Sequence, residues 1–154
     1  MALILVSLLT VASPAEAQKT TVPAVMLAEK PETAWWMTQL RQARQFGATA
    51  LAGLEATPTD DAIPVDEKVL QAARDTYVLL RSARGGIGIA RNDRRYSGPI
   101  TELVFKRVDE AWNLARVPVD RISWGNSRTE YLEVSIPSLR RSLQLVDQVF
   151  ALMP

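Results

Sequence analysis

Apolar residues recur at alternating steps of four and three along four separate segments of this 154-residue chain. That spacing places them on one face of an α-helix, whereas a half-buried strand would alternate at every second residue. The segments span about residues 33–56, 65–90, 99–117 and 128–153. In the first segment the stripe consists of Trp36, Leu40, Ala43, Gly47, Ala50 and Leu54. The sequence contains no convincing strand pair, repeat or low-complexity tract, so it predicts an all-α protein.

Proline and glycine residues separate the four segments. The connections cover about residues 57–64, 92–98 and 118–127. Because short connections between long helices favour antiparallel neighbours, we expect an up-down-up-down four-helix bundle. The fourth helix has the most regular aliphatic stripe, but Pro137 lies inside it. An internal proline removes a backbone hydrogen bond, so we expect this helix to be kinked or divided near Pro137.

The second helix contains three glycines within residues 85–88. Each glycine in a helix interior costs about 1 kcal/mol relative to alanine, so the last turns are intrinsically weak. The helix either ends near Arg84 or continues through the glycines. Ile87 and Ala90 keep the apolar spacing of the preceding turns, and this favours a helix that continues.

The N-terminus has the layout of a secretory signal peptide. Residues 2–12 form a mainly apolar run, and Ala15 and Ala17 then give the Ala-x-Ala pattern of a cleavage site. The run is too short to span a bilayer, which takes about 20 apolar residues. We therefore expect a cleaved signal peptide at 1–17, an extended lead-in at 18–31 and a single helical domain at 32–154. No Lys or Arg precedes the run, and a buried N-terminal helix is the alternative.

The predicted signal peptide places the protein in the periplasm or outside the cell, with no transmembrane segment after cleavage. The chain contains no Cys and no His. It therefore has no disulfide, no Cys or His metal site and no Ser-His-Asp or Cys-His catalytic pair. We assign no catalytic residue, no metal and no cofactor. The formal net charge is only +1, which gives no reason to expect nucleic acid as a partner.

Five arginines lie between residues 81 and 96, close to the glycines of the second helix. They are Arg81, Arg84, Arg91, Arg94 and Arg95. Guanidinium groups bind carboxylate or phosphate through paired hydrogen bonds, and glycines let a ligand approach the backbone closely. These arginines are the candidates for an anion-binding site at one end of the bundle. The alternative is a solvated helix end whose cations complement the helix dipole.

Trp35 and Trp36 are adjacent, so both cannot face the core from one straight helix. The exposed member of the pair could anchor a partner, or it could pack under residues 18–31. With Tyr96, these two tryptophans are the candidate partner-binding residues. Trp124, in the last connection, is expected to plug the end of the bundle.

Acidic residues gather between Glu55 and Glu67. Asp60 and Asp61 could contribute to a hard-cation site, but no EF-hand spacing is present. A solvated loop with carboxylates at a helix N-terminus is the favoured interpretation. The helical carboxylates show no spacing that would bring two of them into one cleft for acid–base chemistry.

These features favour an exported, non-enzymatic binding module whose partner is a protein or a small anionic ligand. The first alternative is an enzyme without His or Cys that acts on an anionic substrate through the arginine cluster. That enzyme would need at least three of the arginines to converge beside a carboxylate. The second alternative is a carrier of a lipid or small apolar ligand, with an enclosed cavity near Pro137.

Overall fold

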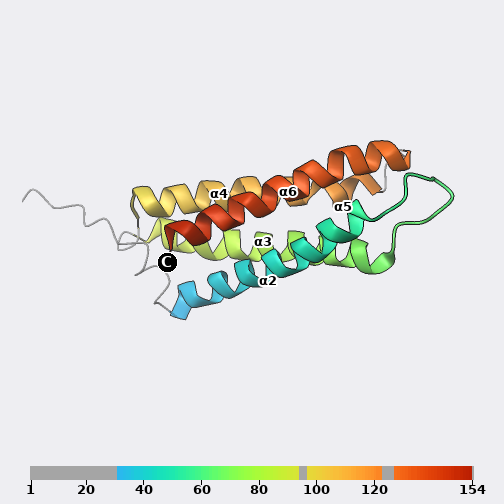
Figure 1. The fold of residues 1–154 in the computed structure, drawn as a ribbon. Helices are drawn as coiled ribbons and strands as arrows, with labels where there is room; N and C mark the ends of the chain where they lie inside the picture. The colour runs from blue at the N-terminus through green and yellow to red at the C-terminus, as the bar shows by residue number, and fades with distance from the viewer. Residues whose placement is uncertain (1–30, 94–96, 123–126, 154) are drawn as a thin grey trace, which may run out of the picture.

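The structure is a computed structural model that describes residues 31–93, 97–122 and 127–153, with the side chains of 31–34 left aside. Its elements are α2 (Pro31–Glu55), α3 (Glu67–Asn92), α4 (Pro99–Ala115), α5 (Val117–Arg121) and α6 (Arg128–Leu152). Every regular element in these residues is a helix, so the predicted all-α class is confirmed. The four long helices lie side by side (Figure 1). None of the helices in the described residues is long and apolar enough to cross a membrane.

Side-chain caps fix where the helices begin. The Asp66 carboxylate accepts a hydrogen bond from the Lys68 backbone N–H at 2.8 Å and starts α3. At α6, Ser127 is the N-cap and forms a reciprocal capping box with Glu130. Asp61 adds a long-range cap, because its carboxylate accepts a hydrogen bond from the Arg128 backbone N–H at 2.5 Å. The acidic connection thus stabilises two helix N-termini.

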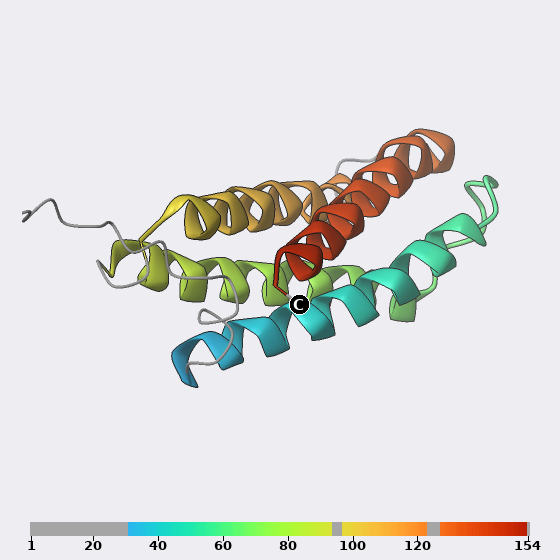
Figure 2. The same ribbon diagram turned by 60° about the vertical axis from the view of Figure 1, so that its left-hand side comes forward.

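Contacts between helices show how neighbouring helices are oriented. Along α2 and α3, Trp36 lies beside Gly86, whereas Gly53 lies beside Val69. The residue numbers rise on one helix as they fall on the other, so α2 and α3 run in opposite directions. Figures 1 and 2 show the same arrangement, with α2 beside α3 and α4 beside both α3 and α6.

The core divides into two clusters along the bundle. One cluster occupies the end where α2 begins and α3 finishes, and the other occupies the end near the α2–α3 connection. The first contains Trp36, Leu40, Leu80, Ile87, Val104, Val108, Leu145 and Val149. The second contains Ala50, Leu54, Val65, Ala73, Tyr131, Leu132 and Leu139. The stripe residues of the sequence thus supply most of the buried apolar surface, which is the main driving force for folding.

Three local predictions have clear outcomes. The helix α3 continues through the glycine cluster to Asn92, as its apolar spacing indicated. The helix α6 is continuous across Pro137, so the predicted division there is wrong, and a bend at Pro137 stays a prediction. The short helix α5 was not predicted, because most of it lies within residues 118–127, which were expected to form a connection. A proline at the first turn loses no hydrogen bond, since that N–H has no partner within the helix.

The predicted signal peptide, its cleavage site and most of the lead-in lie outside the described residues, as do Trp124 and Pro154. Of the candidate site residues, Arg94, Arg95 and Tyr96 also lie outside them. The candidates that can be placed are Trp35, Trp36, Arg81, Arg84 and Arg91.

Candidate functional site

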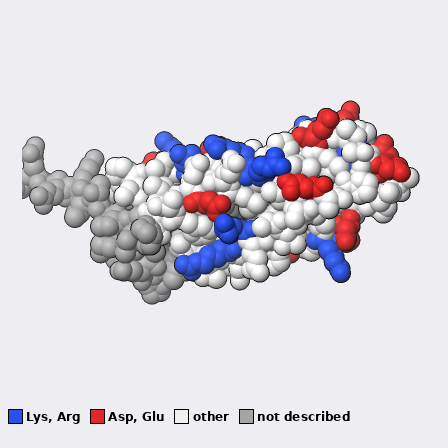
Figure 3. Space-filling view, in the orientation of Figure 1, with Lys and Arg blue, Asp and Glu red and all other residues white. Residues whose placement is uncertain are grey.

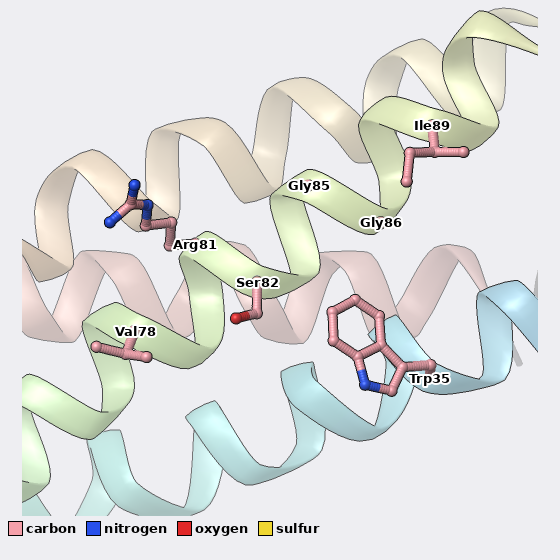
Figure 4. Close-up of a pocket in the computed structure, with 7 residues that line it drawn as sticks. All are labelled: Trp35, Val78, Arg81, Ser82, Gly85, Gly86 and Ile89. Atoms are coloured by element: carbon pink, nitrogen blue, oxygen red, sulfur yellow. The ribbon is translucent and has the colours of Figure 1, made fainter.

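A groove on the surface of the bundle runs between α2 and α3 and has a volume of about 510 Å³. Its lining residues are Trp35, Val78, Arg81, Ser82, Gly85, Gly86 and Ile89. Trp35 comes from α2 and all the others come from α3 (Figure 4). We call this site the Trp35–Arg81 groove. It brings one of the candidate partner-binding residues together with one of the candidate anion-binding residues.

The helical period explains why these α3 residues share a face. Val78, Ser82, Gly85 and Ile89 follow one another at steps of four, three and four. They form a second stripe on the outer face of α3, on the far side of the helix from its buried stripe. Sequence reasoning missed Val78, Ser82 and Ile89 as site residues. The signal that could have found them is an apolar and glycine-containing stripe on a helix whose core face was already assigned.

Two consecutive glycines shape the floor of the groove. A Cβ atom added to Gly86 would lie 3.0 Å from the Trp36 Cβ and 3.3 Å from the Trp35 ring, so Gly86 lets α2 approach closely. A Cβ atom added to Gly85 would have no neighbour within 4 Å. Gly85 therefore contacts nothing across the groove, and its missing side chain leaves the floor open.

The two adjacent tryptophans have opposite environments. Trp36 is 0% exposed and belongs to the first core cluster. Trp35 is 51% exposed and stands against Gly86 at the groove. Only one member of the pair was expected to be exposed, and it is Trp35. Because Trp36 is fully buried, it is not available to a partner, and its place among the partner-binding candidates is corrected to a core residue.

Two further groove residues expose large apolar side chains. Val78 is 54% exposed and Ile89 is 73% exposed. Together with Trp35 they place three of the most exposed apolar side chains in the described residues around one hollow. Singly exposed apolar residues need no explanation, but a cluster around a concave surface is typical of an interaction site.

Arg81 is the one charged residue among the described residues that line the groove. It is exposed and makes no ion pair with any residue that the structure describes. In Figure 4 its guanidinium lies near Val78, on the opposite side of the α3 ribbon from Ser82 and from the Trp35 ring, which stands near Gly86. None of the described residues that line the groove carries a carboxylate. The site therefore combines an apolar surface with one unpaired cation.

Arg84 faces a different neighbour, the helix α4. Its guanidinium forms an ion pair with Asp109 and lies 4.9 Å from the centroid of the Trp112 ring. Tyr77 stacks on the same indole, with ring centroids 6.0 Å apart. Charge pairing and cation–π contact together hold α3 against α4.

Arg91 repeats this arrangement two turns further along α3. Its Nε lies 2.6 Å from a carboxylate oxygen of Glu102, and its guanidinium lies 4.6 Å from the centroid of the Phe105 ring. Arg84 and Arg91 therefore have their charges matched by carboxylates of α4. The three placed arginines of the candidate cluster do not converge, because Arg81 lies in the groove and the other two lie between α3 and α4.

Other carboxylates are also engaged in pairs between helices. Asp147 pairs with Arg44 at 2.5 Å, and Glu55 pairs with Arg140 at 2.6 Å, which joins α6 to α2 at two levels. Among the described residues no group of three or more acidic side chains is placed to hold a metal ion. Figure 3 shows acidic side chains gathered toward the end of the bundle that carries the α2–α3 connection.

A second, smaller hollow of about 260 Å³ lies where α4 meets α5. Its lining is Asn113, Arg116, Val117, Asp120 and Arg121. Arg116 and Asp120 form an ion pair within it at 2.7 Å. Because these charges already neutralise each other, this hollow has less to offer a ligand than the Trp35–Arg81 groove.

Comparison with known proteins gives no further guide to the site. The chain matches no family model, no curated protein and no solved structure. The case for function therefore rests on the geometry of the groove.

Proposed function

We propose that this protein is an exported helical binding module that holds an apolar, anionic group of a partner protein or small ligand in the Trp35–Arg81 groove. The proposal takes the fold to be the up-down-up-down bundle that the antiparallel contacts support. In such a bundle the groove is carried on two long helices, which give a binding site a rigid frame.

The observation that carries the proposal is the meeting of Trp35 and Arg81 in one hollow. An exposed tryptophan and an arginine are the residue types most enriched where binding energy concentrates at interfaces. The tryptophan, with Val78 and Ile89, suits an apolar group. The unpaired guanidinium suits a carboxylate or another anion attached to that group.

The lining of the groove also favours binding over catalysis. An enzyme of the kind considered would need a carboxylate beside the arginines to move a proton. The carboxylates that lie beside candidate arginines are Asp109 and Glu102. They are paired with Arg84 and Arg91, outside the groove. A carrier would need an enclosed cavity near Pro137, but Pro137 is exposed and does not line the groove.

The binding site can be tested with 1-anilinonaphthalene-8-sulfonate, a fluorescent probe that combines aromatic rings with a sulfonate. The variant Gly85→Leu fills the open floor of the groove, and we expect it to weaken binding at least about ten-fold. The variant Arg81→Gln removes only the charge, and we expect a loss of about three-fold. Trp35→Ala should also weaken binding of the probe, because the Trp35 ring forms one wall of the groove.

Matched controls lie on α2 outside the groove. Ala48→Leu adds the same kind of side chain at an exposed position, and Arg41→Gln removes the same charge. Neither should change the affinity for the probe. Equal affinity for Gly85→Leu and Ala48→Leu would contradict the proposal. A tagged chain should then recover one reproducible partner from its native envelope, and Gly85→Leu should lose it.

Export is supported by the apolar run at residues 2–12 and by the Ala15-Glu16-Ala17 pattern. Mass spectrometry of the protein from its native cells should find an N-terminus at Gln18, in the periplasm or in the medium. An intact Met1 in a cytoplasmic fraction would contradict export. It would leave the groove unaffected, because α2 begins after this segment.

A further inference from the structure

We propose that the chain's own residues 22–28 occupy the Trp35–Arg81 groove when no partner is bound, so that a partner has to displace them. This inference rests on the proposed function, because it assigns a regulator to the same site. The segment lies outside the described residues; its sequence, the position at which α2 begins and the surface of the groove support the inference.

The first step is the composition of the segment. Residues 22–28 read Val-Pro-Ala-Val-Met-Leu-Ala, which is seven uncharged residues without an amide or hydroxyl side chain. Charged residues follow at once, Glu29 and Lys30, and α2 then begins at Pro31. The segment is retained in the chain whether or not residues 1–17 are removed. An apolar stretch of this kind gains free energy from any apolar surface within its reach.

Second, residues 22–28 are long enough to reach the groove from the start of α2. Trp35 lies four residues after the start of α2, or about 6 Å along the helix axis. From Ile89 to Val78 the groove follows eleven residues of α3, or about 16 Å. Seven residues in extended conformation span about 23 Å. The segment is therefore long enough to enter at Trp35 and to run the length of the groove without any change in α2.

The third step is the fit between the two surfaces. The groove offers Trp35, Val78 and Ile89 as exposed apolar contacts, and none of its described lining residues is a carboxylate beside which an apolar chain would be unfavourable. Gly85 leaves its floor open to a backbone or a methyl group. The Ser82 hydroxyl lies in the lining and can hydrogen-bond to a peptide group.

Fourth, the short connection between residues 22–28 and α2 keeps the segment close to the groove. A short flexible connection gives a segment an effective concentration of about millimolar at a nearby site. Residues 29 and 30 alone separate this segment from α2. Even a weak intrinsic affinity for the groove is therefore enough for occupancy, and an external partner has to exceed it. The segment leaves Arg81 unpaired, because it has no acidic side chain, and an anionic partner would gain that contact in addition.

The test uses engineered cysteine pairs in the full chain, which has no cysteine of its own. One pair is Met26→Cys with Ile89→Cys, in the groove. The matched control is Met26→Cys with Leu103→Cys, an exposed apolar position on α4 near the same end of the bundle. Under mild oxidation, mass spectrometry should show the groove pair forming its disulfide at least about ten-fold faster, as occupancy raises effective concentration.

Gly85→Leu should slow the groove pair at least about five-fold and leave the control pair unchanged, because it fills the floor that the segment needs. Equal rates for the two pairs, or a groove pair that is indifferent to Gly85→Leu, would overturn the inference. Circular dichroism of each variant checks that the helices are retained.

A second measurement separates this inference from the proposed function. In the double variant Val25→Asp with Leu27→Asp the segment should leave the groove. If the segment fills four-fifths of the grooves in the unaltered chain, the sulfonate probe should then bind about five-fold more tightly. If the groove pair forms its disulfide faster than the control pair, but Gly85→Leu does not change probe binding, the proposed function is overturned and the occupant is supported. Probe binding that Gly85→Leu abolishes, with unselective disulfides, would overturn the occupant alone.

Discussion

Glycines of α2 and α3 have different surroundings toward the two ends of the contact between these helices. Toward the α2–α3 connection, which we call the closed end, an added Cβ on Gly53 would collide with the methyl groups of Val69 on α3, and one on Gly47 would lie 3.2 Å from Thr76 Cγ2 on α3 and 2.6 Å from the Leu143 side chain on α6. At the other end, which we call the hollow end, Gly86 is packed against Trp35 and Trp36, and the neighbouring Gly85 lies at the Trp35–Arg81 groove. At the hollow end, the space beside Gly85 is empty to at least 4 Å. The same residue type therefore lets helices touch in one region and leaves a ligand-sized gap in the other.

The largest expected effect is a difference in the free energy of unfolding between variants of two neighbouring tryptophans on α2. Trp36→Ala removes a fully buried side chain and should lower the free energy of unfolding by about 3–5 kcal/mol. Trp35→Ala removes a half-exposed side chain from the hollow end, and the loss should stay below about 1 kcal/mol. Urea unfolding followed by circular dichroism measures both.

A third variant sharpens this comparison. The Trp36 indole N–H is buried and has no hydrogen-bond partner in the described residues. Trp36→Phe keeps most of the apolar contact and removes that unpaired group, so it should cost clearly less than Trp36→Ala. Similar losses for Trp35→Ala and Trp36→Ala would show that both rings are buried and that the groove is not open.

The next effect concerns the closed end. Gly47→Leu inserts a side chain between Leu143 of α6 and Thr76 of α3. Overpacking at such a site costs about 3 kcal/mol, and the better helix propensity of leucine offsets about 1 kcal/mol. A net loss of about 2 kcal/mol is expected from urea unfolding. A stability equal to that of the unaltered chain would show that α2 and α3 do not need a glycine to approach there.

A smaller effect at the closed end depends on pH. Tyr131 is buried, and its hydroxyl donates a hydrogen bond to the Pro118 carbonyl oxygen at 3.1 Å. Burial raises the pKa of Tyr131 above its usual value of 10.0. Above that pH the unfolded chain loses the phenol proton while the folded chain keeps it, so stability falls as the pH rises.

The variant Tyr131→Phe isolates this contribution. Near pH 7 it should be about 1 kcal/mol less stable than the unaltered chain, because the hydrogen bond to Pro118 is lost. As the pH rises toward about 11 the two stabilities should converge, since only the unaltered chain carries the ionisable phenol. Urea unfolding at both pH values measures the difference. A gap that stays constant with pH would contradict a raised pKa at Tyr131.

Much of the fold was predictable because helical spacing and capping are local properties of the sequence. The stripe from Trp36 to Leu54 and the passage of α3 through its glycines were both expected and observed. The missed helix α5 depends on the position of Pro118 in a first turn. The continuity of α6 across Pro137 depends on packing against neighbouring helices, which no local rule supplies.

The site was less predictable, because it depends on which face of α3 each arginine occupies. Arg81, Arg84 and Arg91 were grouped by proximity in sequence. Arg84 and Arg91 are seven residues apart and lie almost directly above one another on the helix, about 60–80° around it from Arg81. Arg84 and Arg91 share the face that meets α4, where Asp109 and Glu102 match their charges. Ion pairs between helices depend on residues far apart in the sequence. They exclude Arg84 and Arg91 as anion-binding candidates and leave Arg81.

The smallest expected effect on stability is also the most direct comparison of the two ends of the α2–α3 contact. Gly85→Leu makes at the hollow end the same substitution as Gly47→Leu at the closed end. The comparison is made in the Val25→Asp, Leu27→Asp background, in which residues 22–28 are expected to have left the groove. With no described atom within 4 Å of the added Cβ, the better helix propensity of leucine at position 85 should raise the free energy of unfolding by about 0.5–1 kcal/mol. Urea unfolding of the two variants side by side measures the contrast. A loss of stability for Gly85→Leu in this background would contradict open space at Gly85, whereas opposite signs for the two variants would locate the gap there.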